Sequence, residues 1–399
     1  MASRQARLTE GSVGRHLVAM TVPVLFGIFT MMLQAFVDMW FIGRVGVREL
    51  AALSFAFPVL MVVTSVAIGL GAGTSSVVAR ALGADDHERA KRLSTDSLIL
   101  SLLIASICMI AGVLTVEPLF RGLGAPEDLL PTIRGFMTIV YLAIPFIVLG
   151  MVSTATMRAT GDTRLPSKLM IGGAIVNVLL DPIFIFGIGP IPALGLNGAA
   201  IAGFLARGLF FFAAFFYLAY RLDLVTIGKP DLAVMRQSWR DILHVGLPAA
   251  GTNVIVPLGL TLVTMMIADF GPNAVAGFGV ASRIESLVLV LYYAISAIIG
   301  PFVGQNLAVG KEARIQAALR LCAIFCILSG LGIATLLALG SGFLPGLFSD
   351  NPAVTDVTRL FLRIAPISYG AYGIVMVVNA AFNGLGNPMP GVVISLTRI

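Results

Sequence analysis

Two aspartates and one asparagine stand inside segments that are otherwise almost wholly apolar. Asp38 lies in PVLFGIFTMMLQAFVDMWFIG (23–43), and Asn177 and Asp181 lie in NVLLDP, within the longer run MIGGAIVNVLLDPIFIFGIG. An acid at the centre of a membrane-spanning helix costs at least about 2.5–3.5 kcal/mol on insertion scales, so it normally faces a bundle interior or an aqueous cavity. These residues are therefore candidates for binding a cation.

The spacing of the polar residues brings further ligands to the same place. Asn177 and Asp181 are one helical turn apart on one face, and Gln34 has the same relation to Asp38. Pro182 lacks an N–H and clashes with the carbonyl one turn earlier, which frees that carbonyl toward the site. Burial and a like-charged neighbour both favour the neutral form of a carboxyl group, so one acid can hold a proton. The alternative is structural, in which the acids only cap or hydrogen-bond neighbouring helices.

The elements that carry these residues are apolar helices. The 399-residue chain is 58% hydrophobic and 12% charged, whereas an ordinary soluble domain has about a quarter charged residues. The sequence predicts an all-α polytopic membrane protein, because its apolar runs are continuous and long enough to span a bilayer as helices. They lack the period-2 alternation of a β-barrel. Spans are expected near 16–43, 50–79, 93–116, 132–157, 169–188, 195–220, 242–268, 274–307, 313–340 and 354–383, with an eleventh beginning near 390.

The basic residues indicate how the chain is oriented. Lys and Arg are concentrated in the N-terminal segment and in the even-numbered loops, and positively charged loops tend to remain cytoplasmic. We therefore expect a multi-pass protein of the cell (plasma or inner) membrane with a cytoplasmic N-terminus. The same bias accounts for the net charge of +6, so no nucleic-acid partner is expected.

The sequence offers little support for an enzyme. It has no P-loop, no Ser/His/Asp order and no Gly-rich dinucleotide fingerprint. Its three cysteines lie in apolar helices and its three histidines are scattered, so we expect neither a metal site nor a cofactor beyond a coupling ion. These residues are Cys108, Cys322, Cys326, His16, His87 and His244.

An internal repeat divides the chain into two similar halves. VGVRELAALSFAFP (45–58) resembles FGPNAVAGFGVASR (270–283), and VVARALGADDHERAKR (77–92) resembles FVGQNLAVGKEARIQA (302–317), with the same offset in both pairs. A repeat of six helices is even, so both copies enter the membrane in the same sense, as in parallel-repeat transporters.

The repeat predicts the domain organisation. We expect a six-helix N-terminal lobe at 1–220, a cytoplasmic inter-lobe linker at 221–241 and a C-terminal lobe at 242–399. By the same offset, we expect the second lobe to be incomplete and truncated in helix 11.

Several motifs, in order, resemble the multidrug and toxic compound extrusion (MATE) family. They are the run from Pro23 to Pro58, RATGDTRLP (158–166), NVLLDP and ASRIESLVLVLYYAISAIIGPFVGQN (281–306). The resemblance covers essentially the whole chain. It implies a cation-coupled antiporter of two six-helix lobes that exports cationic or amphipathic compounds by alternating access.

The resemblance also implies a first-lobe cation site. In the family this site uses an acid on the first helix and an Asn-x-x-x-Asp pair on the fifth, which match Asp38, Asn177 and Asp181. A hydroxyl residue on the sixth helix often completes the family's site, but residues 195–220 contain no Ser or Thr. This departure favours H+ as the coupling ion, with Na+ as the alternative.

Other residues are candidates for supporting roles. Apolar and aromatic side chains with a few polar groups typically line substrate cavities, although such side chains also pack in cores or face lipid. Pro23 and Pro248 can bend their helices and are candidate hinges. The cavity candidates are Phe29, Met32, Phe36, Tyr141, Met157, Met265 and Tyr292.

Three intramembrane charges need separate interpretations. Arg207, near the middle of 195–220, could pair with Asp181, but its depth differs by about 9 Å for straight helices, which favours a structural role. Arg283 and Glu285 are two residues apart and point to different sides of their helix, so structural ion pairs with other helices are expected.

The sequence thus favours a proton-coupled multidrug antiporter that acts as a monomer on small organic cations or amphipaths in the lipid bilayer. One alternative is a lipid-linked saccharide flippase of related fold, which should prefer a cavity rich in Arg or Lys. Another is a non-functional truncated remnant.

Overall fold

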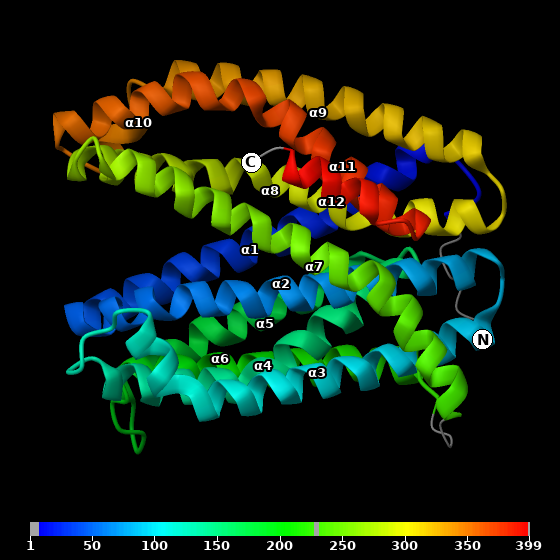
Figure 1. Ribbon diagram of the computed structural model, residues 1–399, viewed down its shortest axis with the longest axis horizontal. Coiled ribbons are helices and arrows are strands. Elements are labelled where there is room, and N and C mark those ends of the chain that lie inside the picture. The colour runs from blue at the N-terminus through cyan, green and yellow to red at the C-terminus, as the bar shows by residue number, and fades with distance from the viewer. Residues whose placement is uncertain (1–7, 227–230, 398–399) are drawn as a thin grey trace.

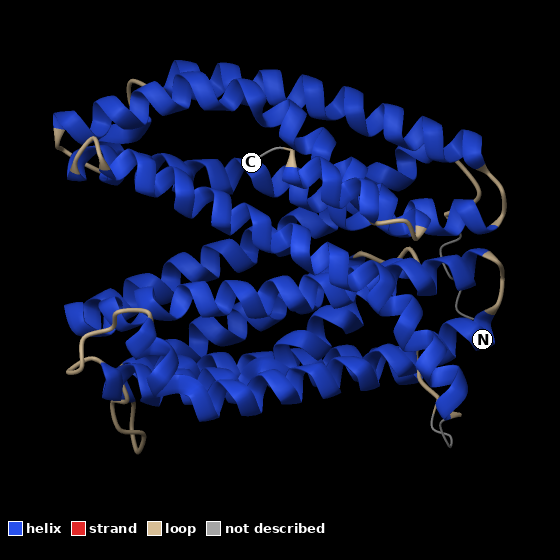
Figure 2. Ribbon diagram, in the orientation of Figure 1, coloured by secondary structure: helices blue, strands red, loops and turns tan. Residues whose placement is uncertain are grey.

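The computed structural model describes residues 8–226 and 231–397, and within these ranges it contains helices and no strands (Figure 2). Ten of the helical segments in the described ranges are long and apolar enough to cross a membrane. The predicted all-α membrane fold is therefore confirmed. The first half of the chain forms α1 (Val13–Val45), α2 (Val47–Gly83), α3 (His87–Gly122), α4 (Leu130–Ala159), α5 (Arg164–Pro182), the π-helical turn η1 (Ile183–Gly187) and α6 (Leu196–Tyr220).

The second half of the chain forms α7 (Leu232–Ala268), α8 (Pro272–Ala308), α9 (Glu312–Gly340), the 3-10 turn η2 (Leu344–Leu347), α10 (Pro352–Ile364), the 3-10 turn η3 (Ala365–Ser368), α11 (Tyr369–Leu385) and α12 (Met389–Leu396). Helices α2–α6 pack together in the lower part of Figure 1, and α8–α12 pack together in the upper part. These two groups are the lobes of the protein.

Helices α1 and α7 cross between the lobes. The first turns of α1 place Leu17, Met20 and Val24 in the hydrophobic core of the second lobe, whereas the later part of α1 packs along α5. Conversely, Ile242 near the start of α7 belongs to the core of the first lobe. Each lobe therefore contains the beginning of the other lobe's first helix, which joins the two lobes mechanically.

One expected helix limit was wrong. Helix α7 begins at Leu232, inside the expected linker, because the Asp231 side chain accepts hydrogen bonds from the backbone N–H groups of Ala233 and Val234. Arg236, Gln237 and Arg240 lie exposed on this first part of α7. The span expected at 354–383 is confirmed as the candidate membrane span Pro352–Leu385, although the turn η3, whose second residue is Pro366, divides it into α10 and α11.

The lobes meet toward one end of the bundle, which we call the N-face because the N-terminal segment lies there; we call the opposite end the far face. A β-carbon at Gly69 of α2 would lie 2.5 Å from the β-carbon of Ala250 in α7, so this close approach requires a glycine. Ser76 Oγ of α2 donates to the Asn383 carbonyl of α11 at 2.5 Å. Small residues at helix crossings permit such backbone contacts in membranes.

Toward the far face the lobes diverge, at the left of Figure 1. Large apolar side chains are exposed on the helices that border this region, including Trp40 on α1, Phe57 on α2 and Met265 and Met266 on α7. The contacts described above all lie in the other half of the bundle. The lobes are therefore in contact at the N-face and diverge toward the far face (Figure 1).

The N-terminal segment reinforces the closed end. Leu8 is fully buried, and its backbone N–H donates to Gln305 Oε1 of α8 at 3.0 Å. Its carbonyl accepts from Arg314 Nη2 at 3.0 Å. The Gln305 amide nitrogen donates to the Ala159 carbonyl at the end of α4, at 2.7 Å. One glutamine side chain thus connects both lobes and the N-terminal segment.

Gln305→Ala should loosen closure of the N-face. The substitution removes both hydrogen bonds, and each neutral bond contributes about 1 kcal/mol, so the population open at this face should rise roughly fivefold or more. We would measure maleimide labelling of Ser76→Cys, which is buried at the lobe contact, in a background without native cysteines.

Gln237→Ala is the matched control, because this exposed glutamine hydrogen-bonds only Asp241 on its own helix, at 2.8 Å. Its labelling rate should equal that of the parent. Equal rates in the Gln305→Ala protein would show that this side chain does not hold the lobes together.

Candidate functional site

Parallel packing of α1 and α5 positions the predicted cation-binding residues. Gly27 of α1 allows close contact, since a β-carbon there would lie 3.3 Å from the Met170 sulfur of α5. Both helices run from the N-face to the far face, so residues that follow this contact stay level along the pair. As a result, Gln34 stands beside Asn177, and one turn further Asp38 stands beside Asp181.

The amide and carboxyl groups form one connected cluster. The Gln34 and Asn177 side chains are in direct contact, and Gln34 Nε2 donates to Asp38 Oδ2 at 3.3 Å. When the Asn177 amide is oriented to pair both of its polar atoms, its nitrogen lies 3.3 Å from Asp38 Oδ1 and its oxygen accepts from the Gly203 N–H of α6 at 3.1 Å. Asn177 therefore links three helices.

The two carboxyl groups lie within interaction range of each other. Asp181 is 1% exposed, and its Oδ2 has no hydrogen-bond partner among the described residues. Asp38 is half-buried. Two carboxylates in such surroundings repel each other when both are ionised. The pair has open oxygen positions for a proton or another small cation.

The helix carrying Asp181 changes its form directly after the acid. Helix α5 ends at Pro182, and the π-helical turn η1 follows without a break. Such wide turns are rare and frequently occur at functional sites. The opening expected at the carbonyl one turn before Pro182 stays a prediction, and the π-helical turn lies on the other side of the proline.

Arg207 lies closer to the site than straight-helix depths suggested. Its Nη1 would be 2.6 Å from a β-carbon placed on Gly203, and the Asn177 side-chain amide would be 3.9 Å from the same point. The guanidinium interacts electrostatically with both Asp38 and Asp181. Side chains in a helix tilt toward its N-terminus, which for α6 is the far-face end, so Arg207 points toward the acids.

The sequence contained a signal for this arrangement. Gly203 precedes Arg207 by four residues and is therefore on the same face of α6. The depths of the Cα atoms did not predict the proximity of Arg207 to the acids, because the arginine side chain is long and points toward them.

The candidate cavity residues fall into two groups. Phe29, Phe36 and Met265 are exposed, and Met32 is partly exposed. The other three residues, Tyr141, Met157 and Tyr292, are buried within the lobes.

Glycines on neighbouring helices explain the burial of the two tyrosines. A β-carbon at Gly112 would lie 2.5 Å from the Tyr141 ring, and one at Gly373 would lie 2.5 Å from the Tyr292 ring. Both rings therefore pack inside a lobe in this conformation. Substrate contact by the residues of either group stays a prediction.

The candidate hinges lie where the crossing helices pass between lobes. Pro23 lies in α1 between Met20 and Val24 of the second-lobe core, and Pro248 lies in α7 two residues after Gly246. Both helices continue through the prolines. Bending at these positions also stays a prediction.

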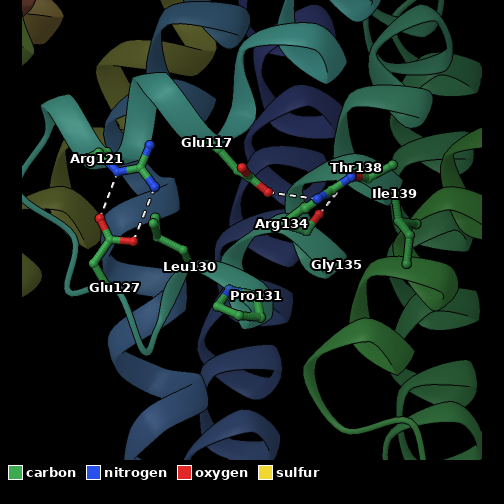
Figure 3. A pocket seen from close by; sticks show the side chains of 9 residues that line it. All are labelled: Glu117, Arg121, Glu127, Leu130, Pro131, Arg134, Gly135, Thr138 and Ile139. Atoms are coloured by element: carbon green, nitrogen blue, oxygen red, sulfur yellow. Dashed lines mark hydrogen bonds and ion pairs between the residues drawn. The ribbon is translucent and has the colours of Figure 1, made fainter.

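A separate cavity of about 550 Å³ lies near the far face between α3 and α4 (Figure 3). Two ion pairs line it, Arg121 with Glu127 and Arg134 with Glu117, each at 2.7 Å. Hydrogen bonding to Arg121 lowers the pKa of the Glu127 carboxyl. Exposed pairs of this kind contribute little to stability, and none of the lining residues belongs to the Asp38–Asp181 cluster.

Comparison with known proteins identifies the family. The MatE family model matches residues 23–183 and 248–399. The FAD transporter of Shewanella oneidensis is 36% identical over 392 residues, which cover 98% of this chain and 87% of that protein. YoeA of Bacillus subtilis, named as a probable multidrug resistance protein, is 26% identical over 98% of this chain and 85% of its own length.

The fold agrees with a solved transporter. The crystal structure of the MATE transporter VcmN from Vibrio cholerae matches with a TM-score of 0.92 and 32% identity, covering 97% of this chain and 87% of that one. The chain therefore belongs to the MatE family of multi-pass membrane transporters, which are not enzymes.

Proposed function

We propose that this protein is a proton-coupled antiporter that exports small organic molecules, with Asp38 and Asp181 as the coupling-ion site. The observation that carries the proposal is the close pair of acids from α1 and α5, one of which has a buried oxygen without a partner. Gln34 and Asn177 orient the pair through their amides.

The proposed mechanism uses α1 as the coupling element. A proton bound between the acids removes their repulsion and changes how the later part of α1 packs on α5. Because the first turns of α1 lie in the second-lobe core, a shift of this helix is transmitted to the other lobe. Pro23 lies at the end of the part of α1 that packs in the second-lobe core and is the proposed bending point.

The orientation proposed for the protein follows from its basic loops. With the N-face in the cytoplasm of the cell, the described conformation is open to the outside. Protons would then bind the acid pair from the outside and be released inside, in exchange for substrate. Cationic or amphipathic compounds suit the acidic cluster, because they can compete with the proton for the same negative charge.

A second candidate substrate is an anionic aromatic nucleotide such as FAD, the compound that names one relative. One observation favours it: Arg283 of α8 is exposed although it lies about 16 Å along an apolar helix. No hydrogen bond or ion pair of its guanidinium is found among the described residues. A guanidinium in this setting suits a pyrophosphate group.

Asp38→Asn and Asp181→Asn should each reduce dye efflux at least tenfold, because an amide cannot take up and release the coupling proton. The assay is efflux of ethidium from proteoliposomes under an imposed pH gradient. Asp350→Asn, at an exposed position between α9 and α10, should leave efflux unchanged.

Efflux that persists in both site variants would refute the assignment of the coupling site. Efflux that requires a Na+ gradient and ignores the pH gradient would refute only the choice of proton.

Arg283→Gln should distinguish the two substrate classes. If FAD is carried, the loss of a charge-assisted contact should lower its transport roughly tenfold, while ethidium transport should change less than about twofold. Transport of both compounds would be followed in the same proteoliposomes.

Arg359→Gln is the control, since this arginine pairs with Asp356 at 2.9 Å on the exposed surface of α10. If the parent protein moves ethidium and does not move FAD, the second candidate is wrong. If Arg283→Gln leaves FAD transport unchanged, the arginine is not its anchor.

A further inference from the structure

Arg207 occupies an unusual position for a charged residue in an apolar helix. Its neighbours along the exposed faces of α6 include Leu205, Leu209 and Phe212, yet its own side chain is half-buried and turns inward over Gly203. Gly203 is buried, and its missing β-carbon leaves the space that the guanidinium takes. The helix is therefore built to direct a positive charge into the first lobe.

That charge faces the acid pair without joining it. The guanidinium interacts electrostatically with Asp38 and Asp181, but no ion pair within 4.0 Å connects it to either acid among the described residues. The Asn177 amide lies beside the same point over Gly203 that the guanidinium occupies. The carboxyl oxygens are thus left open to a mobile cation, and Asp181 Oδ2 is unpartnered.

The charges in the cluster can be counted directly. Two ionised carboxylates and one guanidinium leave a single uncompensated negative charge. A buried site is stabilised when its net charge approaches zero, so one mobile monovalent cation balances this cluster. Without Arg207 the same two acids would need two positive charges.

We propose that Arg207 is a fixed counter-charge of the carboxylate pair, which limits the site to one mobile cation and makes that cation a proton in preference to Na+. The proposal rests on the proposed function, in which this pair binds the coupling ion.

The preference for a proton follows from the way each ion is held. A proton binds covalently to one carboxylate oxygen and needs no further ligands. A Na+ ion would need a shell of several oxygens beside a guanidinium of the same sign, and repulsion between like charges at short range opposes this. The lack of any Ser or Thr in 195–220 removes another potential ligand from the same helix.

Direct measurement of 22Na+ binding to the purified full-length protein tests the proposal. The parent should bind little Na+ at millimolar concentrations, whereas Arg207→Met should bind about one Na+ per chain once the like charge is removed, with a proton supplying the second positive charge. Acidification should displace this Na+, and a second substitution, Asp181→Asn, should abolish its binding. Arg207→Lys keeps the positive charge and should exclude Na+ as the parent does.

Gly203→Ala provides a second test that retains the arginine. The added β-carbon would displace the guanidinium from its place, so partial Na+ binding is expected. Arg359→Met, which removes an arginine from the exposed surface of α10, should bind no more Na+ than the parent.

The proposal would be overturned if the parent bound Na+ saturably. It would also be overturned if a folded Arg207→Met protein bound no Na+. These outcomes are separable from failure of the proposed function, because ion binding is measured without transport. If ethidium efflux persists in Asp38→Asn, the coupling role is wrong, whatever the Na+ result.

Discussion

The repulsion between two carboxyl groups that share a poorly solvated space is the interaction on which this structure depends. Asp38 and Asp181 come from different helices and stand together only because α1 and α5 pack in parallel. Their charge is offset by the side-chain amides of Gln34 and Asn177 and by the nearby Arg207 guanidinium. No direct partner is found for Asp181 Oδ2 among the described residues. Because the negative charge of the acid pair is only partly neutralised, the pair can bind and release a cation.

The crossing of α1 and α7 gives this local interaction a global consequence. A helix held entirely within one lobe could change its packing without moving the other lobe. Here the beginning of α1 is fastened in the second-lobe core by Leu17, Met20 and Val24, while its later part carries Asp38 in the first lobe. The acid pair and the second-lobe core are thus connected by one continuous helix, α1.

At the N-face, polar groups are paired by hydrogen bonds, in contrast to the unpartnered oxygen of the acid pair. Gln305 and Arg314 form hydrogen bonds of 2.7–3.0 Å with backbone groups of the N-terminal segment and of α4. Glycines allow the helix backbones of the two lobes to approach closely. The lobe contact at this end thus relies on small residues and on hydrogen bonds to backbone groups. Such a contact can open without exposing a large apolar surface.

The sequence by itself determined the helical membrane class, the two halves and the identity of the acids, because apolar length, repeat offset and intramembrane charge are local properties of the chain. It also placed Asn177 and Asp181 on one face through their four-residue spacing. It misjudged the start of α7, where Asp231 caps a helix that begins within the polar segment, and it did not predict the 3-10 turn at Pro366 within the last span. Only the tertiary structure decided that Arg207 reaches the acid pair and that Tyr141 and Tyr292 turn into the lobes. The tyrosine positions depend on Gly112 and Gly373 of neighbouring helices, and contacts between distant segments leave no fixed spacing in the sequence. The reach of Arg207 depends on how α6 packs beside α1 and α5.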